Sequence, residues 1–302
     1  MRWVAYAQLV RLPNVFTAMA DIVLGGAATG AILDHFAAFV CVLVASSLLY
    51  MAGMVWNDWF DLKQDLRERP GRPIPSGRVS TKDAATLGSI LLIAGTIAAA
   101  AADLVEGRGW LSLTLALLLV ASILLYDGVL KRTWMGQYAM GSCRFFNVLL
   151  GISSGVETIP PWGYALALSI GVYIVGVTWF AKTEARSSKQ QTLLTAALVM
   201  AGGLLLSLTV PTLALEDSSA SATPSPLFPF LLAAYGFYLG LKILPAIHDP
   251  RPDRVQPAVK RAILGLVLFD AILATSLVGW PGLAIVVLLL PAMWLGKWLY
   301  ST

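Results

Sequence analysis

The chain has 302 residues, of which 58% are hydrophobic and 13% are charged, and its mean hydropathy is +0.75. A soluble domain carries about 25% charged residues, so this composition excludes an ordinary soluble protein and predicts a polytopic membrane protein. The net charge of +4 is modest and indicates no nucleic-acid partner. Cys41 and Cys143 both lie within apolar segments, which argues against a disulfide framework.

Ten apolar segments along the chain are long enough to cross a membrane. They are predicted at residues 14–34, 36–56, 82–102, 109–126, 137–155, 162–181, 191–210, 228–246, 261–279 and 282–299. We therefore expect an all-α polytopic membrane protein in which a single domain covers residues 1–302. One of the last segments is open to a second interpretation, as a re-entrant rather than a spanning helix.

Positive charge alternates from loop to loop. The basic segments are the N-terminus and the loops at 57–81, 127–136, 182–190 and 247–260. The loops between them are short, neutral or acidic, except for a mixed loop at 103–108. Because positive residues near span ends mark the cytoplasmic side, we predict that both termini are cytoplasmic.

Polar residues interrupt this apolar pattern in VWNDWFDLKQDLRERPGRPIPSGRVS, residues 55–80. Asn57, Asp61 and Asp65 are spaced by four, so a helix that continued past the membrane edge would align them on one face, with Asp58 beside them. Carboxylates at this spacing repel one another unless a cation neutralises them. Mg²⁺ takes oxygen ligands and binds one or two carboxylates together with substrate phosphates. We therefore predict Mg²⁺ as the cofactor.

Arginines follow these acids in the segment RPGRPIPSGR. Arg72 and Arg78 are suited to hold the same phosphates, and the prolines and glycines favour a defined non-helical path. The alternative is that the acids only form a solvated charged face with Arg67 and Arg69. Acids at membrane depth rarely lack a function, which favours a binding site.

The pattern N-D-x-x-D-x-x-x-D followed by R-P-I-P-S-G-R is similar to the first signature of the UbiA superfamily of intramembrane prenyltransferases. RLPNVFTA (11–18), YDGVLKR (126–132) and RFFNVLLG (144–151) resemble further segments of that family in the same order. The stretches RLPNVFTAMADIVLGG, KTEARSSKQQTLL and VQPAVKRAILGL also resemble a divergent UbiA-like branch associated with bacterial Ebo gene clusters. This resemblance implies a location in the inner (plasma) membrane of a bacterium.

The resemblance implies a bundle of nine to ten transmembrane helices around a central cavity. It also implies an enzyme that transfers a prenyl group from a polyprenyl diphosphate to an aromatic, lipid or other small acceptor, with Mg²⁺ on the diphosphate. Catalytic roles fall to Asp61, Tyr126 and Lys131, and metal binding falls to Asp58, Asp61 and Asp65. The candidate substrate-binding residues are Asn57, Arg72, Arg78, Arg132, Arg144, Asn147, Lys182, Glu184, Arg186 and Lys189.

The chain departs from the family where a second acidic motif is expected, after the sixth span. WFAKTEARSSKQQ (179–191) carries one acid, Glu184, among Lys182, Arg186 and Lys189. A lone carboxylate among three cations is a poor Mg²⁺ site but a fair site for phosphate. This departure leaves open a non-catalytic protein of the same fold that binds a prenyl lipid or handles a secondary metabolite.

A later segment, HDPRPDRVQPAVKR (248–261), contains two acids at the missing spacing. Pro250 and Pro252 argue against one helix through Asp249 and Asp253, so we expect a turn with local Asp–Arg pairing.

Arg144, Asn147 and Asp21 are polar residues inside predicted spans. Arg144 and Asn147 fall on one helical face and are expected to line the cavity, although Arg144 could instead be a paired structural arginine. Asp21 is expected to pair within the bundle or to line the cavity mouth. An ion-relay transporter built on Asp21 or Arg144 is disfavoured, because matched Gly- or Pro-broken helices are missing.

Overall fold

The computed structural model describes residues 2–107, 109–184, 187–217 and 223–300. Within these ranges the chain forms helices and no strands. The helices are α1 (Arg2–Leu9), η1 (Leu12–Asn14), α2 (Val15–Ala28), α3 (Ala31–Asp34), α4 (Phe36–Phe60), α5 (Leu62–Glu68), α6 (Thr81–Glu106), α7 (Leu111–Gly128), η2 (Leu130–Arg132), α8 (Gly136–Ser153), α9 (Pro161–Ala181), α10 (Gln190–Leu206), η3 (Ser207–Thr209), α11 (Val210–Glu216), α12 (Phe228–His248), α13 (Pro252–Val278), η4 (Trp280–Leu288) and α14 (Leu289–Tyr300).

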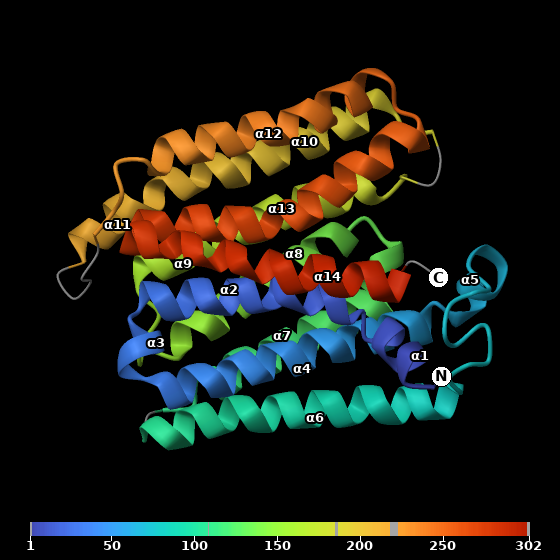
Figure 1. Cartoon of the computed structure of the whole chain (residues 1–302), viewed down its shortest axis with the longest axis horizontal. Helices are drawn as coiled ribbons and strands as arrows, with labels where there is room; N and C mark the ends of the chain where they lie inside the picture. The colour runs from blue at the N-terminus through green and yellow to red at the C-terminus, as the bar shows by residue number, and fades with distance from the viewer. Residues whose placement is uncertain (1, 108, 185–186, 218–222, 301–302) are drawn as a thin grey trace.

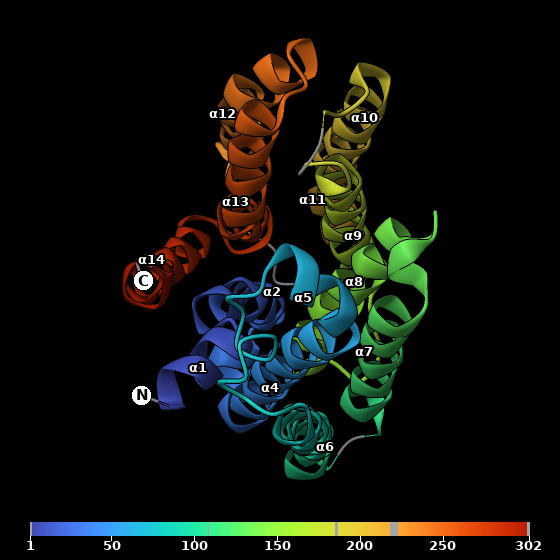
Figure 2. The same ribbon diagram turned by 90° about the vertical axis from the view of Figure 1, so that its right-hand side faces the viewer.

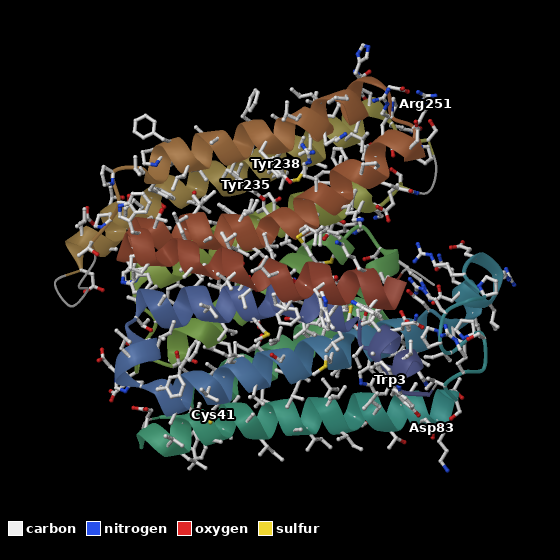
Figure 3. All side chains as sticks on the ribbon, viewed as in Figure 1. Trp3, Cys41, Asp83, Tyr235, Tyr238 and Arg251 are labelled. Atoms are coloured by element: carbon white, nitrogen blue, oxygen red, sulfur yellow. The ribbon has the colours of Figure 1, made fainter. Side chains whose placement is uncertain are left out.

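The long helices run side by side along the longest dimension of the molecule (Figure 1). Both chain ends lie at the same end of the bundle as α5, whereas α3 and α11 lie at the opposite end. The turn between α12 and α13, which carries Arg251, lies at the α5 end as well (Figure 3). This end therefore collects the basic N-terminal region, the 57–81 segment and the 247–260 turn. Which side of a membrane it faces stays a prediction.

Eight of the described helices are long and apolar enough to cross a membrane, and a ninth results if the pair Trp3–Leu9 and Leu12–Ala28, bent by 44°, counts as one span. The last apolar segment, Trp280–Leu299, is among the eight. The predicted span at 137–155 forms α8, which is not counted because polar side chains interrupt its apolar run. α8 nevertheless packs against α2, α7 and α9 within the bundle.

The prediction for α13 was wrong at its beginning. The helix begins at Pro252 and not near residue 261, so it has 27 residues. Proline is accommodated there because the first turn of a helix has no hydrogen-bond partner for its backbone N–H groups. The short turn before it pairs Arg251 with Asp249 at 2.6 Å, as expected. That exposed hydrogen bond lowers the pKa of Asp249 below its ordinary value.

Helices α2, α4, α7, α8, α9 and α13 surround a central cavity, and α5 lies across one end of this group (Figure 2). The outer helices α10 and α12 pack on α9 and α13, and α6 packs on α4. Burial differs widely among the helices. In α13, 72% of the apolar stretch lies inside the protein, compared with 22% in α6.

Two glycines bring α2 and α8 into backbone contact. A Cβ added to Gly25 would lie 2.5 Å from the backbone of Gly151, and one added to Gly151 would lie 2.8 Å from Cα of Ile22. Such small-residue contacts are a common means of close helix packing in membranes. The contact matters for the site because α2 and α8 both line the cavity.

We predict that Gly25→Ala lowers the free energy of unfolding by about 1–3 kcal/mol, because the added methyl group forces two backbones apart. Chemical unfolding in mixed micelles measures the change. Gly202→Ala on α10 is the matched control, since a Cβ there meets no atom within 4 Å. Equal stability of the two variants would contradict a packing role for Gly25.

Candidate functional site

The central cavity has a volume of about 490 Å³ and is open at the α5 end. Its mouth is lined by charged and amide side chains, and its interior includes Leu119, Ile123, Ile174 and Val177. On α4 the lining extends from Asn57 inward to Ser46, eleven residues or about 16 Å along a helix. A ligand with a charged head and an apolar tail matches this division.

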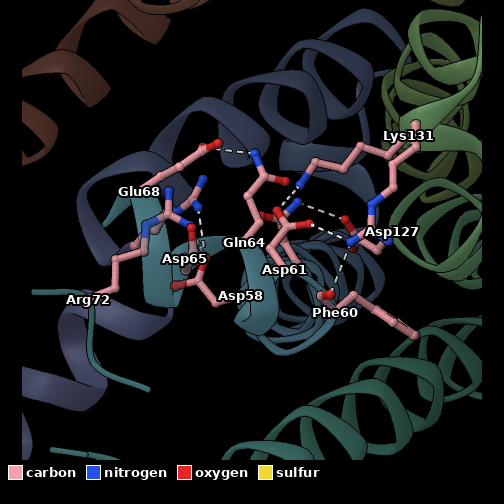
Figure 4. Close-up of polar contacts among 12 residues, drawn as sticks. Asp58, Phe60, Asp61, Gln64, Asp65, Glu68, Arg72, Asp127 and Lys131 are labelled. Carbon is pink, nitrogen blue, oxygen red and sulfur yellow. Dashed lines mark hydrogen bonds and ion pairs between the residues drawn. The ribbon is translucent and has the colours of Figure 1, made fainter. Parts of the chain in front are cut away.

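The helix that carries the acidic residues is broken at Asp61. α4 ends at Phe60 and α5 begins at Leu62, although Asp61 N–H still donates to Asn57 O and Asp65 N–H to Asp61 O. The predicted single polar face is therefore divided. Asp61 points toward the α7–α8 connection, while Asp58 and Asp65 point toward Arg72 (Figure 4).

Asp58 and Asp65 share one arginine. Arg72 Nη1 donates to Asp58 Oδ1 at 3.1 Å and to Asp65 Oδ2 at 2.7 Å. Asp58 also accepts from Arg11 Nη2 at 2.9 Å. Both carboxylate side chains are 4% exposed. Burial of this depth requires a partner for each charge. These ion pairs therefore tie α4 and α5 to the segment between α1 and η1 and to the loop after α5.

Asp61 is neutralised from the other side of the mouth. Lys131 Nζ donates to Asp61 Oδ2, and Arg132 Nη2 lies 3.7 Å from Asp61 Oδ1. Lys131 also lies 5.9 Å from the centre of the Tyr126 ring. The predicted catalytic residues Asp61, Tyr126 and Lys131 therefore meet at one wall of the cavity.

Asp127 is a mouth residue that the sequence analysis did not assign. It is 7% exposed, and its Oδ1 accepts from Asn57 Nδ2 at 2.8 Å. Its position next to Tyr126 in YDGVLKR was the available signal. Asn57 is thus held by a neighbouring helix and not by the acids of its own segment.

A small hydrophobic cluster fixes the loop that carries Arg72. Ile74 and Val79 are 5% and 2% exposed and pack with Leu9 of α1 and Val55 of α4. Gly77 adopts φ +72°, a conformation that other residues rarely tolerate. The proline-rich segment is therefore a folded loop that is anchored beside the acids.

Arg144 and Asn147 lie deeper on α8 and face Asp21 on α2. Arg144 Nη1 donates to Asp21 Oδ2 at 3.0 Å, and Asn147 Nδ2 donates to the same oxygen at 2.8 Å. Ser46 Oγ donates to Asn147 Oδ1 at 2.6 Å. The two interpretations of Arg144 hold together, since it is paired with Asp21 and also lines the cavity.

Most of the predicted site residues meet in this cavity. Those that line it are Asn57, Asp61, Asp65, Arg72, Tyr126, Lys131, Arg144, Asn147 and Glu184. The lining does not include Asp58, Arg78, Arg132, Lys182 or Lys189.

The residues outside the lining have other contacts. Arg78 donates to Gln8 Oε1 and Gly71 O, and Lys182 donates to Thr133 O. Arg186 lies outside the described residues. Among the predicted residues of this loop that the structure describes, only Glu184 reaches the cavity. Partial burial raises the pKa of Glu184, an effect that Arg69 opposes.

The donor set at the mouth fits Mg²⁺ in its chemistry. It consists of carboxylate and amide oxygens, which are the ligands this ion prefers. In the described part of the chain no three Asp, Glu, His or Cys side chains are gathered around one point, because Asp58 and Asp65 face Arg72 and Asp61 faces Lys131. The metal role of Asp58, Asp61 and Asp65 stays a prediction, and it requires those cations to move aside.

Comparison with known proteins identifies the family. Residues 14–242, about three quarters of the chain, match the UbiA prenyltransferase family. The chain belongs to the UbiA prenyltransferase family. The resemblance seen in the sequence is thereby confirmed, and the matched region contains nearly all of the cavity lining.

The curated relatives within the family are archaeal. Digeranylgeranylglyceryl phosphate synthase of Methanopyrus kandleri is 34% identical over 152 residues, covering 49% of this chain and 53% of the relative. The synthase of Methanosarcina mazei is 33% identical over 138 residues, covering 46% of each chain. The chain thus spans about half the length of the curated relatives it matches. The predicted Ebo-type branch and bacterial membrane are not addressed by these relatives.

Solved UbiA-type structures share the fold. A digeranylgeranylglyceryl phosphate synthase aligns with a TM-score of 0.67 at 20% identity, covering 91% of this chain and 99% of that one. A UbiA homolog from Archaeoglobus fulgidus bound to GPP and Mg²⁺ aligns with a TM-score of 0.62 at 16% identity, covering 94% and 99%. The predicted all-helical UbiA-type bundle around a central cavity is confirmed.

We predict that Arg72→Met lowers the free energy of unfolding by about 3 kcal/mol, because it leaves Asp65 without its cation in a buried place. Adding Asp65→Asn to this variant should recover part of the loss, since it removes the uncompensated charge. Chemical unfolding in mixed micelles measures both changes. Arg254→Met, at an exposed arginine of α13, is the control. A loss no larger than that of the control would show that Arg72 does not hold the mouth together.

Proposed function

We propose that this protein transfers a prenyl group from a polyprenyl diphosphate to an acceptor within the membrane, with Mg²⁺ as cofactor. The observation that carries the proposal is the cavity itself. Its mouth brings together the carboxylates Asp61 and Asp65 with Arg72 and Lys131, and its interior is largely apolar. Relatives named digeranylgeranylglyceryl phosphate synthase and a neighbour bound to GPP and Mg²⁺ support the same reaction.

Binding of the donor begins with its charge. The diphosphate lies at the mouth, where Arg72 and Lys131 exchange their carboxylate partners for phosphate oxygens. The prenyl chain then extends along the apolar interior toward Leu119 and Ile123. Asp61 and Asp65, released from their cations, are the residues that would hold Mg²⁺. When bound there, the ion supplies positive charge that favours departure of the diphosphate.

Transfer breaks the bond between the allylic carbon and the diphosphate oxygen, and the electron pair leaves with the diphosphate. Lys131 and Arg132 face the negative charge that develops. The rings of Tyr126 and Tyr50 line the cavity beside the mouth and can shelter the allylic cation. A nucleophilic atom of the acceptor forms the new bond to carbon, and its proton passes to the departed diphosphate or to water at the open mouth.

The nature of the acceptor is a further part of the proposal. Arg144 and Asn147 place hydrogen-bonding groups deep in the lining, where a purely apolar chain needs none. We infer that they bind oxygen atoms of the acceptor, and that the acceptor carries a polar group into the cavity. A phosphate-bearing isoprenoid glycerol, as the names of the curated relatives suggest, is the first candidate.

The test is Mg²⁺-dependent turnover by the purified protein in lipid. Geranyl, farnesyl and geranylgeranyl diphosphates serve as donors, with geranylgeranylglyceryl phosphate and a host lipid extract as acceptors. We predict that Asp61→Asn lowers kcat/KM by at least about 100-fold, because the variant loses a carboxylate that would hold Mg²⁺ beside the leaving group. Released diphosphate and new lipid masses are the two readouts.

Glu106→Gln, at a residue near the opposite end of the bundle, is the matched control and should retain wild-type turnover. Unchanged turnover in Asp61→Asn would contradict the proposed site. Tight donor binding without diphosphate release by the wild type would instead favour the non-catalytic lipid-binding alternative. Chelation of Mg²⁺ should abolish release in the wild type.

A further inference from the structure

A buried cluster of polar side chains lies behind the inner end of the cavity, where α2, α8 and α13 meet. Its members are Asp21, Arg144, Asn147 and Asp270. Asp21 and Asp270 are both fully buried, at 0% exposure, and Asn147 is 4% exposed. Each acid lies more than one helical turn from either end of its helix. Ionisable residues at such depth are rare unless they have a function.

If both acids were ionised, three of their four carboxyl oxygens would have no hydrogen-bond donor. Asp21 Oδ2 accepts two hydrogen bonds, from Arg144 and Asn147. Asp21 Oδ1 and both carboxyl oxygens of Asp270 are buried and have no donor. α13 packs directly on α2, which places the Asp270 carboxyl group beside that of Asp21 so that the two interact. A hydrogen bond between the two carboxyl groups requires a proton on one of them.

The charge balance of the cluster also indicates a proton on one of the two acids. Two carboxylates facing one guanidinium would leave an uncompensated negative charge in a fully buried place, which is strongly unfavourable. One proton shared by the two acids makes the cluster neutral. It also gives Asp21 Oδ1 its missing donor. One proton therefore removes the charge imbalance and joins two of the three unpartnered oxygens, one from each acid.

The other titratable groups around Asp270 do not supply this proton. Tyr173 of α9 donates to Ala262 O at 2.9 Å, and Tyr235 of α12 bonds to the Tyr173 hydroxyl at 2.9 Å. Figure 3 shows Tyr235 among the helices on this side of the bundle. On the α4 side, Tyr50 presents its ring to Arg144 at 5.8 Å.

We propose that Asp21 and Asp270 share a single proton, with Asp270 as donor to Asp21 Oδ1, and that this carboxyl pair positions Arg144 for the acceptor. Asp270 touches neither the cavity nor the reacting atoms and acts through Asp21. It is therefore a positioning residue. The role toward the acceptor rests on the proposed function, whereas the shared proton does not.

The orientation of Arg144 follows from its contacts. Nη1 donates to Thr17 O and to Asp21 Oδ2, and Nη2 donates to Thr17 Oγ1 at 2.8 Å. The Nε–H group and one N–H of Nη2 then remain for a ligand in the cavity that Arg144 lines. If Asp270 lost its proton, the second negative charge would draw the guanidinium away from the cavity. The pair thus keeps a cation directed at the substrate in a place where a free charge is unstable.

Infrared spectroscopy tests the shared proton without any turnover. The wild type in lipid near neutral pH should show a C=O stretch of a buried protonated carboxyl group, which shifts slowly in D₂O. Asp270→Asn should remove this band, because Asp21 alone, paired with Arg144, is ionised. Asp21→Asn should keep the band at a shifted frequency, because Asp270 stays protonated.

Glu157→Gln, at an exposed residue, is the matched carboxyl-to-amide control and should leave the spectrum of buried carboxyl groups unchanged. A wild-type spectrum from which Asp270→Asn removes no such band would overturn the proposal. If the wild type forms no product in any assay, the proposed function fails, and the infrared result still decides the shared proton.

Kinetics test the positioning role. Asp270→Asn keeps an N–H donor to Asp21, so its KM for the acceptor should stay within about twofold of wild type, whereas Asp270→Leu should raise that KM by about tenfold or more. KM for the donor diphosphate should change less than about twofold in both. A purely structural role would reduce the amount of active protein and leave both KM values unchanged, and that outcome, or an equal rise in both, would refute positioning.

Discussion

The neutralisation of buried carboxylates is the constraint on which the cavity end of this protein depends. Asp58, Asp61 and Asp65 are nearly removed from solvent, and each is paired with a cation from another segment of the chain. Arg11 comes from before the first span, Arg72 from the proline-rich loop, and Lys131 from the α7–α8 connection. Because an unpaired charge at such depth is unfavourable by several kcal/mol, these pairs also determine where those segments lie. The end of the bundle and the site are therefore assembled by the same interactions.

The same pairs explain how a ligand-binding site can be stable without its ligand. The three cations are 20–27% exposed, so each retains some access to the cavity mouth while it neutralises an acid. A diphosphate offers them equivalent oxygen partners, and the acids they leave are suited to a hard cation. Exchange of partners then keeps the number of charge contacts nearly constant. Stability and binding use one set of residues without requiring a preformed cluster of bare carboxylates.

The sequence predicted the parts of the structure that depend on local pattern. Apolar length alone located the helices, and the spacing of Asn57, Asp61 and Asp65 located the mouth. It did not predict the break at Asp61. The two parts of the predicted polar face are turned toward different cations, Arg72 and Lys131, which lie outside α4 and α5. Asp127 escaped notice for a similar reason: its partner Asn57 is 70 residues away. Pairings of this kind are properties of the packed bundle.

The inner cluster is neutralised in a different way from the acids at the mouth. Asp270 looks, in sequence, like a single acid within an apolar helix, and only the packing of α13 against α2 gives it a partner. No solvent reaches it, so it cannot exchange one cation for another as the mouth residues can. At that depth an uncompensated charge is strongly unfavourable. In the proposed arrangement the cluster is neutral because a proton takes the place of a second cation. For the proposed role of Arg144 toward the acceptor, its partner has to be fixed in charge as well as in position. The ion pairs at the mouth can exchange partners, whereas the cluster at the inner end is neutral and fixed. This difference follows from the decrease in solvent access along the cavity.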